Sequence, residues 1–574
     1  MRRIDILVVV SCLMALVGLG AGMSVSAAPD RMASPPLSSL PETPARDEFR
    51  EGIVGPVATL DPMFAASPAE RAISALLFRG LTRAGSDGTV LPDLAERWEV
   101  GADGTVLTFH LRPDARWHDG VHVSADDVVF TYRALADPSS VGSLAAEWED
   151  VDVRRVDRFT VELRTVAADA GSLVRTRQPI LPAHLLQDVP LSDRAGHPFG
   201  RSPVGNGPFS LAAASDDEVL LERVGAPPGG ISSRYGPDPL SGPPEPTPRT
   251  APPARASLDL YRFLLYPDQA TVVAAFAEGS VDAMAQPDPD ELRALVEEFG
   301  VQVLAFPGTR MLALVPNLRF STGPLRDARV RRSLSAAIDR DAIVQEVFAG
   351  SALAAQRIVS PASSLFDPAS APLPVVDPAE AQAGLVSAGW TRGGEGWTRP
   401  GSSEPVVIEL LVRDEEAASH DLAVAELVAA AWRSIGLLVD VVALSPTDLV
   451  QERLRPGLFD VALLEIDLGL DPDPFALFAS AEAVVGGSNV AGYQSSLVDR
   501  LLADLRSADT SDRAERFAAL QAVLLREMPA IPLAYPDQVF LVRGRLRGVE
   551  PRQVAEDRDR YSDVLAWRLA RPDE

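Results

Sequence analysis

Ionisable side chains crowd the segment FHLRPDARWHDGVHVSADDVVFTYRAL, residues 109–135, where His118 and His122 flank Asp119. Imidazole and carboxylate groups are the usual ligands of zinc and the usual groups for acid–base catalysis. Ligands four residues apart share one face of a helix, but Gly120 and the alternating pattern around it indicate a turn between strands, where the two rings need not converge. The segment is therefore predicted to be scaffold.

Other catalytic patterns are weak or missing. The chain has no G-x-S-x-G elbow and no H-E-x-x-H pair, and the Gly205-Asn206-Gly207 fragment lacks the third glycine and the lysine of a phosphate loop. The carboxylates of Asp471 and Asp473 are each followed by proline, which favours an extended, solvated turn. We therefore expect no catalytic residue, no metal site, no cofactor and no enzymatic activity.

Helix and strand patterns alternate through both halves of the chain. Alternating apolar and polar residues predict a strand at 106–112, and Ser124 precedes a helical pattern as an N-cap residue does. Alternation of this kind is typical of α/β lobes. Further strands are predicted at 258–265 and 437–442, and further helices at 269–278 with Gly279 as its stop, 327–338 and 422–435.

Length and charge limit the classes of protein that fit. A chain of 574 residues is too long for one hydrophobic core, so two or three lobes are expected. It carries 80 acidic and 53 basic side chains, no lysine among them, and a formal net charge of −27. Such a surface repels phosphate backbones, so we expect no nucleic-acid partner.

The N-terminus has the pattern of an export signal. Arg2 and Arg3 precede an apolar run over residues 6–21, and Val25-Ser26-Ala27 fits a cleavage site, so residues 1–27 are predicted to be a signal peptide. The alternative is a retained membrane anchor, because the run approaches the ~20 residues that span a bilayer. Cys12 lies inside the apolar run, which speaks against lipidation. It is the only cysteine, so no disulfide is expected.

Two segments are rich in proline. Residues 28–47 have the composition of a flexible linker, and residues 224–257 hold ten prolines between Pro227 and Pro253 with almost no periodic apolar residues. The second segment is predicted to be a surface insertion in the N-terminal half.

A series of short segments, in order, resembles the family 5 extracellular solute-binding proteins, the dipeptide-, oligopeptide- and nickel-binding components of ABC importers. The resemblance extends over about residues 50 to 550. The matching segments are FRGL (78–81), LPDLAERWEV (91–100), FHLR (109–112), WHDG (117–120), SADDV (124–128), ILPAHLL (180–186), VGNGPF (204–209), EGSVD (278–282), RDARVRR (326–332), AAIDR (336–340), FDVA (459–462) and NVAGY (489–493).

The resemblance implies an α/β fold of the type II periplasmic-binding-protein kind. Two lobes would enclose an inter-lobe ligand cleft, and an extra subdomain would extend the N-terminal lobe. The boundaries this implies are an N-terminal lobe at 48–277 with a subdomain at about 82–180, a C-terminal lobe at 278–495, and a return to the N-terminal lobe at 496–574. The histidines of the opening segment would be structural.

Candidate ligand-binding residues also follow from the resemblance. It places the segment from Glu465 to Asp471, together with Tyr493, at the cleft, with Asp467 as the charge that meets a ligand cation. Peptide binders of this family commonly carry a Trp near this position, and here Ile466 stands in its place.

The resemblance implies an exported, periplasmic or cell-surface protein that captures a peptide or another small organic solute by lobe closure. As a monomer it would deliver that solute to ABC permease subunits. Two alternatives stay open: a membrane-anchored sensory or receptor binding protein, and an exported hydrolase, which would need a catalytic set that the sequence does not display.

Overall fold

The computed structural model describes residues 47–570, except 87–88, 102, 138–147, 149–150, 167–170, 226–257, 321–322, 362, 364, 368, 370–371, 374, 415–418, 470–471, 485, 509–511, 545 and 551. The predicted signal peptide, the linker up to residue 46 and nearly all of the Pro-rich insertion therefore lie outside the described residues. None of the helices in the described part is long and apolar enough to cross a membrane.

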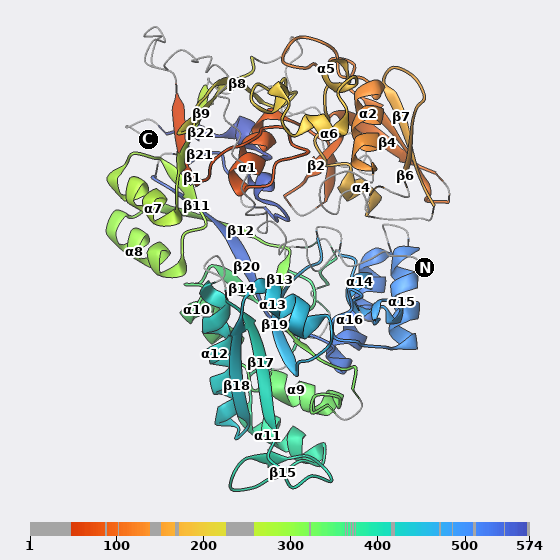
Figure 1. The fold of residues 1–574 in the computed structure, drawn as a ribbon, viewed down its shortest axis with the longest axis vertical. Coiled ribbons are helices and arrows are strands. Elements are labelled where there is room, and N and C mark those ends of the chain that lie inside the picture. Colours follow the sequence, from red (N-terminus) through yellow and green to blue (C-terminus); the bar gives the residue numbers. More distant parts are fainter. Residues whose placement is uncertain are drawn as a thin grey trace, which may run out of the picture.

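One large sheet runs through both lobes of the molecule (Figure 1). In the C-terminal lobe its strands follow the order β18 (Leu438–Leu444), β17 (Val407–Arg413), β19 (Val461–Asp467) and β13 (Arg310–Pro316). Then comes β20 (Ile531–Val542), and in the N-terminal lobe β11 (Ala283–Ala285), β1 (Glu48–Val54), β10 (Leu260–Tyr266), β9 (Glu218–Arg223) and β8 (Phe209–Ala214). Two further strands, β12 (Gln302–Pro307) and β14 (Ala352–Ala354), pair with β20.

Strand β20 joins the two lobes. Its first residues pair with β13, where Leu314 lies opposite Ile531, and its last residues pair with β11, where Ala283 lies opposite Val542. Between them, Pro307 at the end of β12 lies opposite Asp537. The chain also crosses from β12 into β13 within three residues, so the lobes are connected by neighbouring strands (Figure 1).

The C-terminal lobe is a sheet covered on both faces. Met311 and Ala313 of β13 pack with α15 (Ser496–Arg506) and α16 (Arg513–Glu527), whereas Leu312 and Leu314 pack with α12 (Ser419–Ser434). Successive side chains of a strand point to opposite faces, so a strand buried on both sides is apolar at every position. This explains the unbroken MLALV of β13.

The lobe boundaries differ from our expectation in two places. The C-terminal lobe was expected from residue 278, but β11 and β12 belong to the sheet and cores of the N-terminal lobe, so the C-terminal lobe begins with β13. Residues 496–574 were expected to return to the N-terminal lobe, but α15 and α16 do not. These helices contribute Val498, Leu502, Leu520 and Leu524 to the core of the C-terminal lobe, and the chain returns only along β20. Helical periodicity shows which face of a helix is buried, but it carries no information on which lobe buries it.

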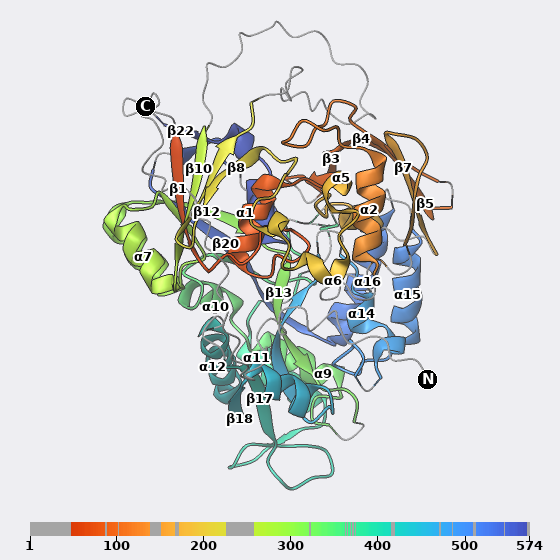
Figure 2. The same cartoon turned by 45° about the horizontal axis from the view of Figure 1, so that its top comes forward.

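A separate small sheet extends the N-terminal lobe (Figure 2). Its strands follow the order β4 (Ala95–Val100), β5 (Val106–Leu111), β7 (Thr160–Thr165) and β6 (Val151–Arg155), and α2 (Ala125–Leu135) contacts β6 and β7. The helix begins where the sequence indicated: the Asp127 carboxylate accepts the Ser124 N–H at 2.8 Å, which completes its first turn.

Several predicted elements are confirmed at their boundaries. Helix α7 (Gln269–Glu278) ends at Gly279, whose φ of 83° is the left-handed conformation that glycine adopts without strain. Helix α9 (Ala328–Ala336) begins after Asp327, whose side chain accepts the Arg329 N–H. Local capping chemistry sets these ends, so the sequence alone locates them.

Candidate ligand-binding site

Charged side chains gather where β13 and β19 reach the junction between the lobes. The two strands are antiparallel, with Arg310 opposite Asp467 and Leu312 opposite Glu465. Arg310 is three residues beyond the end of β12, which belongs to the core of the N-terminal lobe. This end of β13 and β19 therefore faces the inter-lobe space.

Arg310 lies between the two acids. Its guanidinium donates to Glu465 Oε1 at 3.1 Å and lies 3.9 Å from Asp467 Oδ2, which is beyond hydrogen-bonding distance. The Arg310 and Asp467 side chains are 44% and 43% exposed. At such exposure an ion pair contributes only about 0–1 kcal/mol, so exchanging one partner for a ligand group costs little.

Asp467 is held in place by neutral donors. Its Oδ1 accepts the Thr309 hydroxyl at 2.7 Å and the Gly469 N–H at 2.8 Å. These bonds orient the carboxylate while Oδ2 keeps capacity for a further donor. An oriented, half-exposed carboxylate of this kind suits recognition of an amine or amide N–H.

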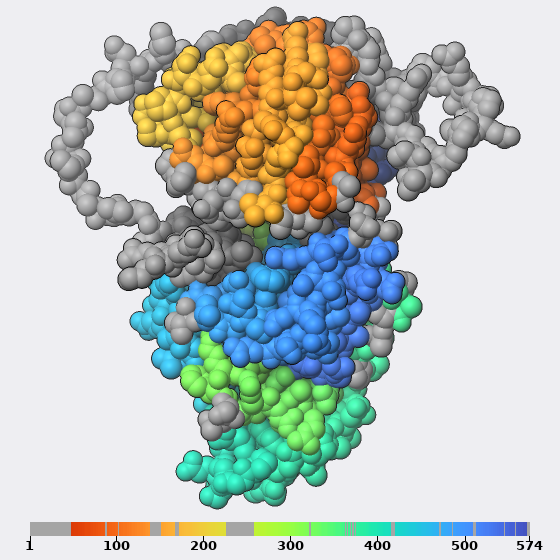
Figure 3. Space-filling model, turned by 90° about the vertical axis from the view of Figure 1, so that its right-hand side faces the viewer, coloured from red at the N-terminus to blue at the C-terminus, as the bar shows by residue number. Residues whose placement is uncertain are grey.

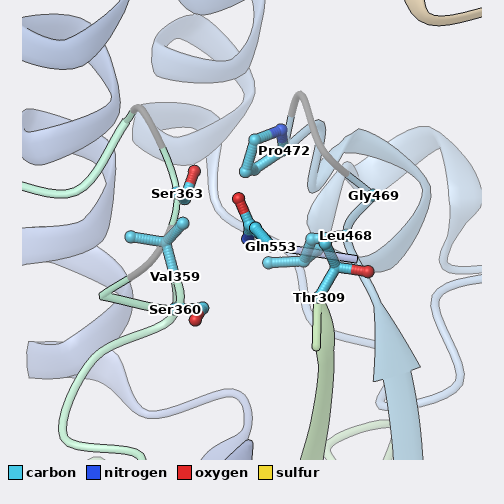
Figure 4. Close-up of a pocket in the computed structure, with 8 residues that line it drawn as sticks. All are labelled: Thr309, Val359, Ser360, Ser363, Leu468, Gly469, Pro472 and Gln553. Atoms are coloured by element: carbon cyan, nitrogen blue, oxygen red, sulfur yellow. The ribbon is translucent and has the colours of Figure 1, made fainter. Parts of the chain in front are cut away.

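A small pocket lies beside this cluster (Figure 4). It encloses about 170 Å³ of space between atoms, part of it open to solvent. Segments of both lobes line it. Gln553 belongs to the C-terminal segment, and its backbone N–H donates to Ser86 O in the N-terminal lobe. Val359 and Leu468 belong to a core of the C-terminal lobe. The remaining lining residues are Thr309, Ser360, Ser363, Gly469 and Pro472.

The pocket lies in the hollow between the lobes. Figure 3 shows this hollow between the orange and yellow surface of the N-terminal lobe and the blue surface of α14 (Phe475–Phe478), α15 and α16. Most of this space lies between closely spaced atoms and is too narrow for a solute group, so binding a solute here requires the lobes to move apart.

Tyr493 lies elsewhere in the C-terminal lobe. Its ring is 5% exposed and packs edge-on against Phe478, and its hydroxyl is hydrogen-bonded to Glu527 at the end of α16. Burial, followed by that hydrogen bond, raises the pKa of the Tyr493 hydroxyl. Tyr493 is not among the residues that line the pocket.

Of the four residues predicted at the cleft, the structure brings Glu465 and Asp467 together on Arg310 and places Tyr493 in a hydrophobic core. Asp471 lies outside the described residues. Sequence reasoning missed Thr309, Arg310 and Gln553. They belong to the junction only through strand pairing, which no local pattern reveals.

The histidines of the opening segment make local contacts. His118 Nε2 lies 3.1 Å from Gly207 O, and Nδ1 accepts the Gly205 N–H at 3.2 Å. Burial lowers the pKa of His118. His122 forms an isolated bridge with Arg116, and no group of three or more His, Cys, Asp or Glu among the described residues is arranged to hold a metal ion.

The Gly205-Asn206-Gly207 fragment is explained by close packing. A Cβ on Gly205 would meet Leu77 O at 1.9 Å, and one on Gly207 would meet Leu76 O at 2.4 Å. Both glycines thus allow this segment to lie against the end of α1 (Pro68–Leu77), where Leu77 O accepts the N–H groups of Asn206 and Gly207.

Comparison with known proteins agrees with this architecture. The family model of bacterial extracellular solute-binding proteins, family 5, middle part, matches residues 89–483. The dipeptide-binding protein of Escherichia coli K12 is 24% identical over 485 residues, covering 80% of this chain and 83% of its own. Heme-binding protein A of Haemophilus influenzae is also 24% identical and covers 80% and 81%.

Among solved structures, NikZ from Campylobacter jejuni in complex with Ni(L-His) superposes with a TM-score of 0.67 at 24% identity, covering 91% of this chain and all of its own. The chain thus has the two-lobed fold of type II periplasmic binding proteins. It belongs to the family 5 extracellular solute-binding proteins and serves as the substrate-binding component of an ABC importer.

Proposed function

We propose that the chain captures a peptide or another small organic solute between its lobes and delivers it to an ABC permease. One observation supports this most directly: the oriented, half-exposed Asp467 carboxylate stands at the inter-lobe junction beside a pocket lined by both lobes. In this proposal the Asp467 carboxylate accepts hydrogen bonds from the amino group of the solute. Glu465 does not contact the solute and instead holds the Arg310 side chain in position.

Lobe closure provides the transport signal. A solute that contacts both lobes binds the closed state better than the open one and shifts the population toward it. The connections at Pro307–Arg310 and at Pro536–Gln538 are short, so rotation about them changes the distance between the lobes with little change within each lobe. The permease would recognise the closed shape.

The family leaves the identity of the solute open. The three relatives carry names for a dipeptide, heme and a nickel–histidine complex. We favour a solute with an amino group because Asp467 offers an oriented acceptor. Ile466, where peptide binders commonly carry a Trp, speaks against their usual peptide preference, so a peptide is one of several amine-bearing solutes to test.

Calorimetric titration with Ala-Ala and Ala-Ala-Ala, each with its N-acetylated form, tests this proposal. We expect saturable binding of the free-amine peptides and at least tenfold weaker binding of the acetylated forms, a difference of about 1.4 kcal/mol. Equal binding of both forms would remove the amine from recognition, and no binding of any peptide would exclude this solute class.

The proposed function also requires export of the chain from the cytoplasm. The chain would act as a non-catalytic monomer outside the cytoplasm after loss of residues 1–27. N-terminal sequencing of the exported protein should begin at Ala28 or within a few residues of it. Recovery of intact Met1 would favour a retained anchor instead.

A further inference from the structure

Two buried acceptor atoms at the lobe junction have no donor. Gln553 is 2% exposed, and its Oε1 has no hydrogen-bond partner among the described residues. The same holds for Oδ1 of Asp537, in the middle of the crossing strand β20. A buried acceptor without a donor costs about 1–3 kcal/mol, so native proteins rarely keep one without a use for it.

Strand register brings the two residues to one face. Asp537 lies opposite Pro307. On the other side of Pro307, Val554 donates its N–H to Pro307 O at 3.0 Å and accepts the Thr309 N–H at 3.2 Å, which sets Gln553 beside Pro307. Directly opposite residues share a face, and strands are about 4.8 Å apart, so the backbones of Asp537 and Gln553 are roughly 10 Å apart.

Gln553 lines the pocket, and Asp537, which is not one of its lining residues, lies on a face of β20 that packs beside it. Tyr535, two residues before Asp537 on the same side of β20, packs in one core with the pocket residues Val359 and Leu468. Figure 4 shows the Gln553 amide extending into the middle of the pocket. Gln538 lies opposite Phe306, whose ring packs into the N-terminal lobe, so its side chain belongs to the other face.

The site is rich in acceptors and poor in positive charge. Burial raises the pKa of Asp537 to about 6, and within the described part of the chain no cation offsets that effect. The Asp537 N–H is already bonded to Ser351 O. A solute group that brings its own N–H donors and a positive charge would satisfy both orphaned oxygens, whereas an anion would be repelled.

We propose that Asp537 and Gln553 form a recognition site for a cationic N–H donor group of the solute, an ammonium or a guanidinium. The inference rests on the proposed capture of a solute between the lobes and assigns its charge class. It is distinct from the Asp467 contact, because Asp537 and Gln553 belong to the crossing strands and the C-terminal segment.

Ligand-observed NMR titration of the whole protein with methylguanidinium chloride tests the proposal at pH 7.5. Tetramethylammonium chloride is the matched probe, with the same charge and no N–H donor. We expect saturable methylguanidinium binding to the wild type and no saturable tetramethylammonium binding. Equal binding of the two probes would show only general attraction to an acidic surface and would overturn the proposal, as would no methylguanidinium binding.

Two substitutions and one control test whether methylguanidinium binds at Asp537 and Gln553. Asp537→Asn and Gln553→Met keep the side-chain size and remove the charge and the acceptor, so each should weaken methylguanidinium at least tenfold. Gln538→Met is the matched control, because Gln538 is the next residue of β20 and also has a buried Oε1 without a donor, but it faces the other way. Equal affinity in Gln553→Met and wild type would overturn the assignment even if Asp537→Asn failed to fold.

Failure of the cation site can be distinguished from failure of the proposed solute capture. Failure of every peptide to bind by calorimetry, with methylguanidinium binding intact, would reject the peptide class and retain the cation site. Peptide binding that is unaffected by Asp537→Asn and Gln553→Met, with no methylguanidinium binding, would retain capture and reject the site.

Discussion

Two clusters of acids and arginine in this protein have similar chemistry and opposite surroundings. In the N-terminal lobe, Glu51 of β1 accepts from Arg560 at 2.8 Å and from Tyr261 at 2.5 Å, and all three side chains are almost fully buried. At the lobe junction, Glu465 and Asp467 flank Arg310, and the Arg310, Asp467 and Glu465 side chains are 44%, 43% and 28% exposed.

The two clusters differ in whether one of their ion-pair partners can be exchanged for a solute group. The Glu51 cluster attaches the C-terminal segment to β1, since Arg560 and Tyr561 both donate to the Glu51 carboxylate, which is fully buried from solvent. The Arg310 cluster can exchange a partner with a solute at small cost. Burial, rather than residue type, separates a structural ion pair from a binding one.

The largest effect is expected from Glu51→Gln. This substitution removes the carboxylate charge that faces the buried Arg560 guanidinium, and breaking a buried ion pair typically costs about 3–5 kcal/mol. Denaturant unfolding should show this loss. Glu48→Gln on the same strand is the control, because the Glu48 side chain is 30% exposed and pairs with Arg262, so its loss should stay near or below about 1 kcal/mol. Similar losses in both variants would mean that burial does not separate them.

Asp537 is a half-buried acid whose Oδ1 has no hydrogen-bond partner among the described residues. Its pKa is raised from 3.8 to about 6, so between these two pH values the folded state keeps a proton that the unfolded state has released. The stability linked to Asp537 is therefore present below pH 4 and is lost as the pH rises through 6. Asp537→Asn removes this loss and should stabilise the protein by about 1–3 kcal/mol at pH 7.5.

Thermal unfolding of Asp537→Asn and wild type between pH 4 and pH 8 measures that gain. The two curves should differ little near pH 4 and separate between pH 5 and pH 7, with the variant the more stable. A constant difference across this range would show that the carboxyl group does not titrate there.

Asp467→Asn removes a charge from the exposed cluster at the lobe junction. It should reduce the affinity for Ala-Ala-Ala at least tenfold, about 1.4 kcal/mol, with little change in unfolding, because the carboxylate is half-exposed. Glu426→Gln, which removes another exposed Arg pair on α12, is the control for general loss of negative charge. Equal affinities of Asp467→Asn and wild type, measured by calorimetry, would exclude Asp467 from the site.

The smallest effects are expected at the two histidines. His122 is half-buried and its Nδ1 has no hydrogen-bond partner among the described residues, so His122→Gln should change the unfolding free energy by no more than about 0.5–1 kcal/mol. His118→Gln removes bonds to Gly205 and Gly207 and should cost about 1 kcal/mol. Neither should change solute affinity in the same calorimetric titration, and a loss in either would contradict a scaffold role.

Local chemistry made part of the fold predictable. Gly279 ends α7 and Asp327 caps α9 because glycine and aspartate act on the backbone within a few residues. The alternation of helices and strands indicated α/β lobes for the same reason, and the ordered segments that resemble family 5 indicated their two-lobed arrangement.

The sequence by itself thus determined the elements, the family and a candidate acid, Asp467. Only the tertiary structure decided which lobe holds α15 and α16, that Arg310 lies opposite Asp467, and that Asp537 and Gln553 share a face because both adjoin Pro307, a distant residue of the chain. Capping and periodicity act between near neighbours, whereas strand register and burial depend on contacts between residues hundreds of positions apart.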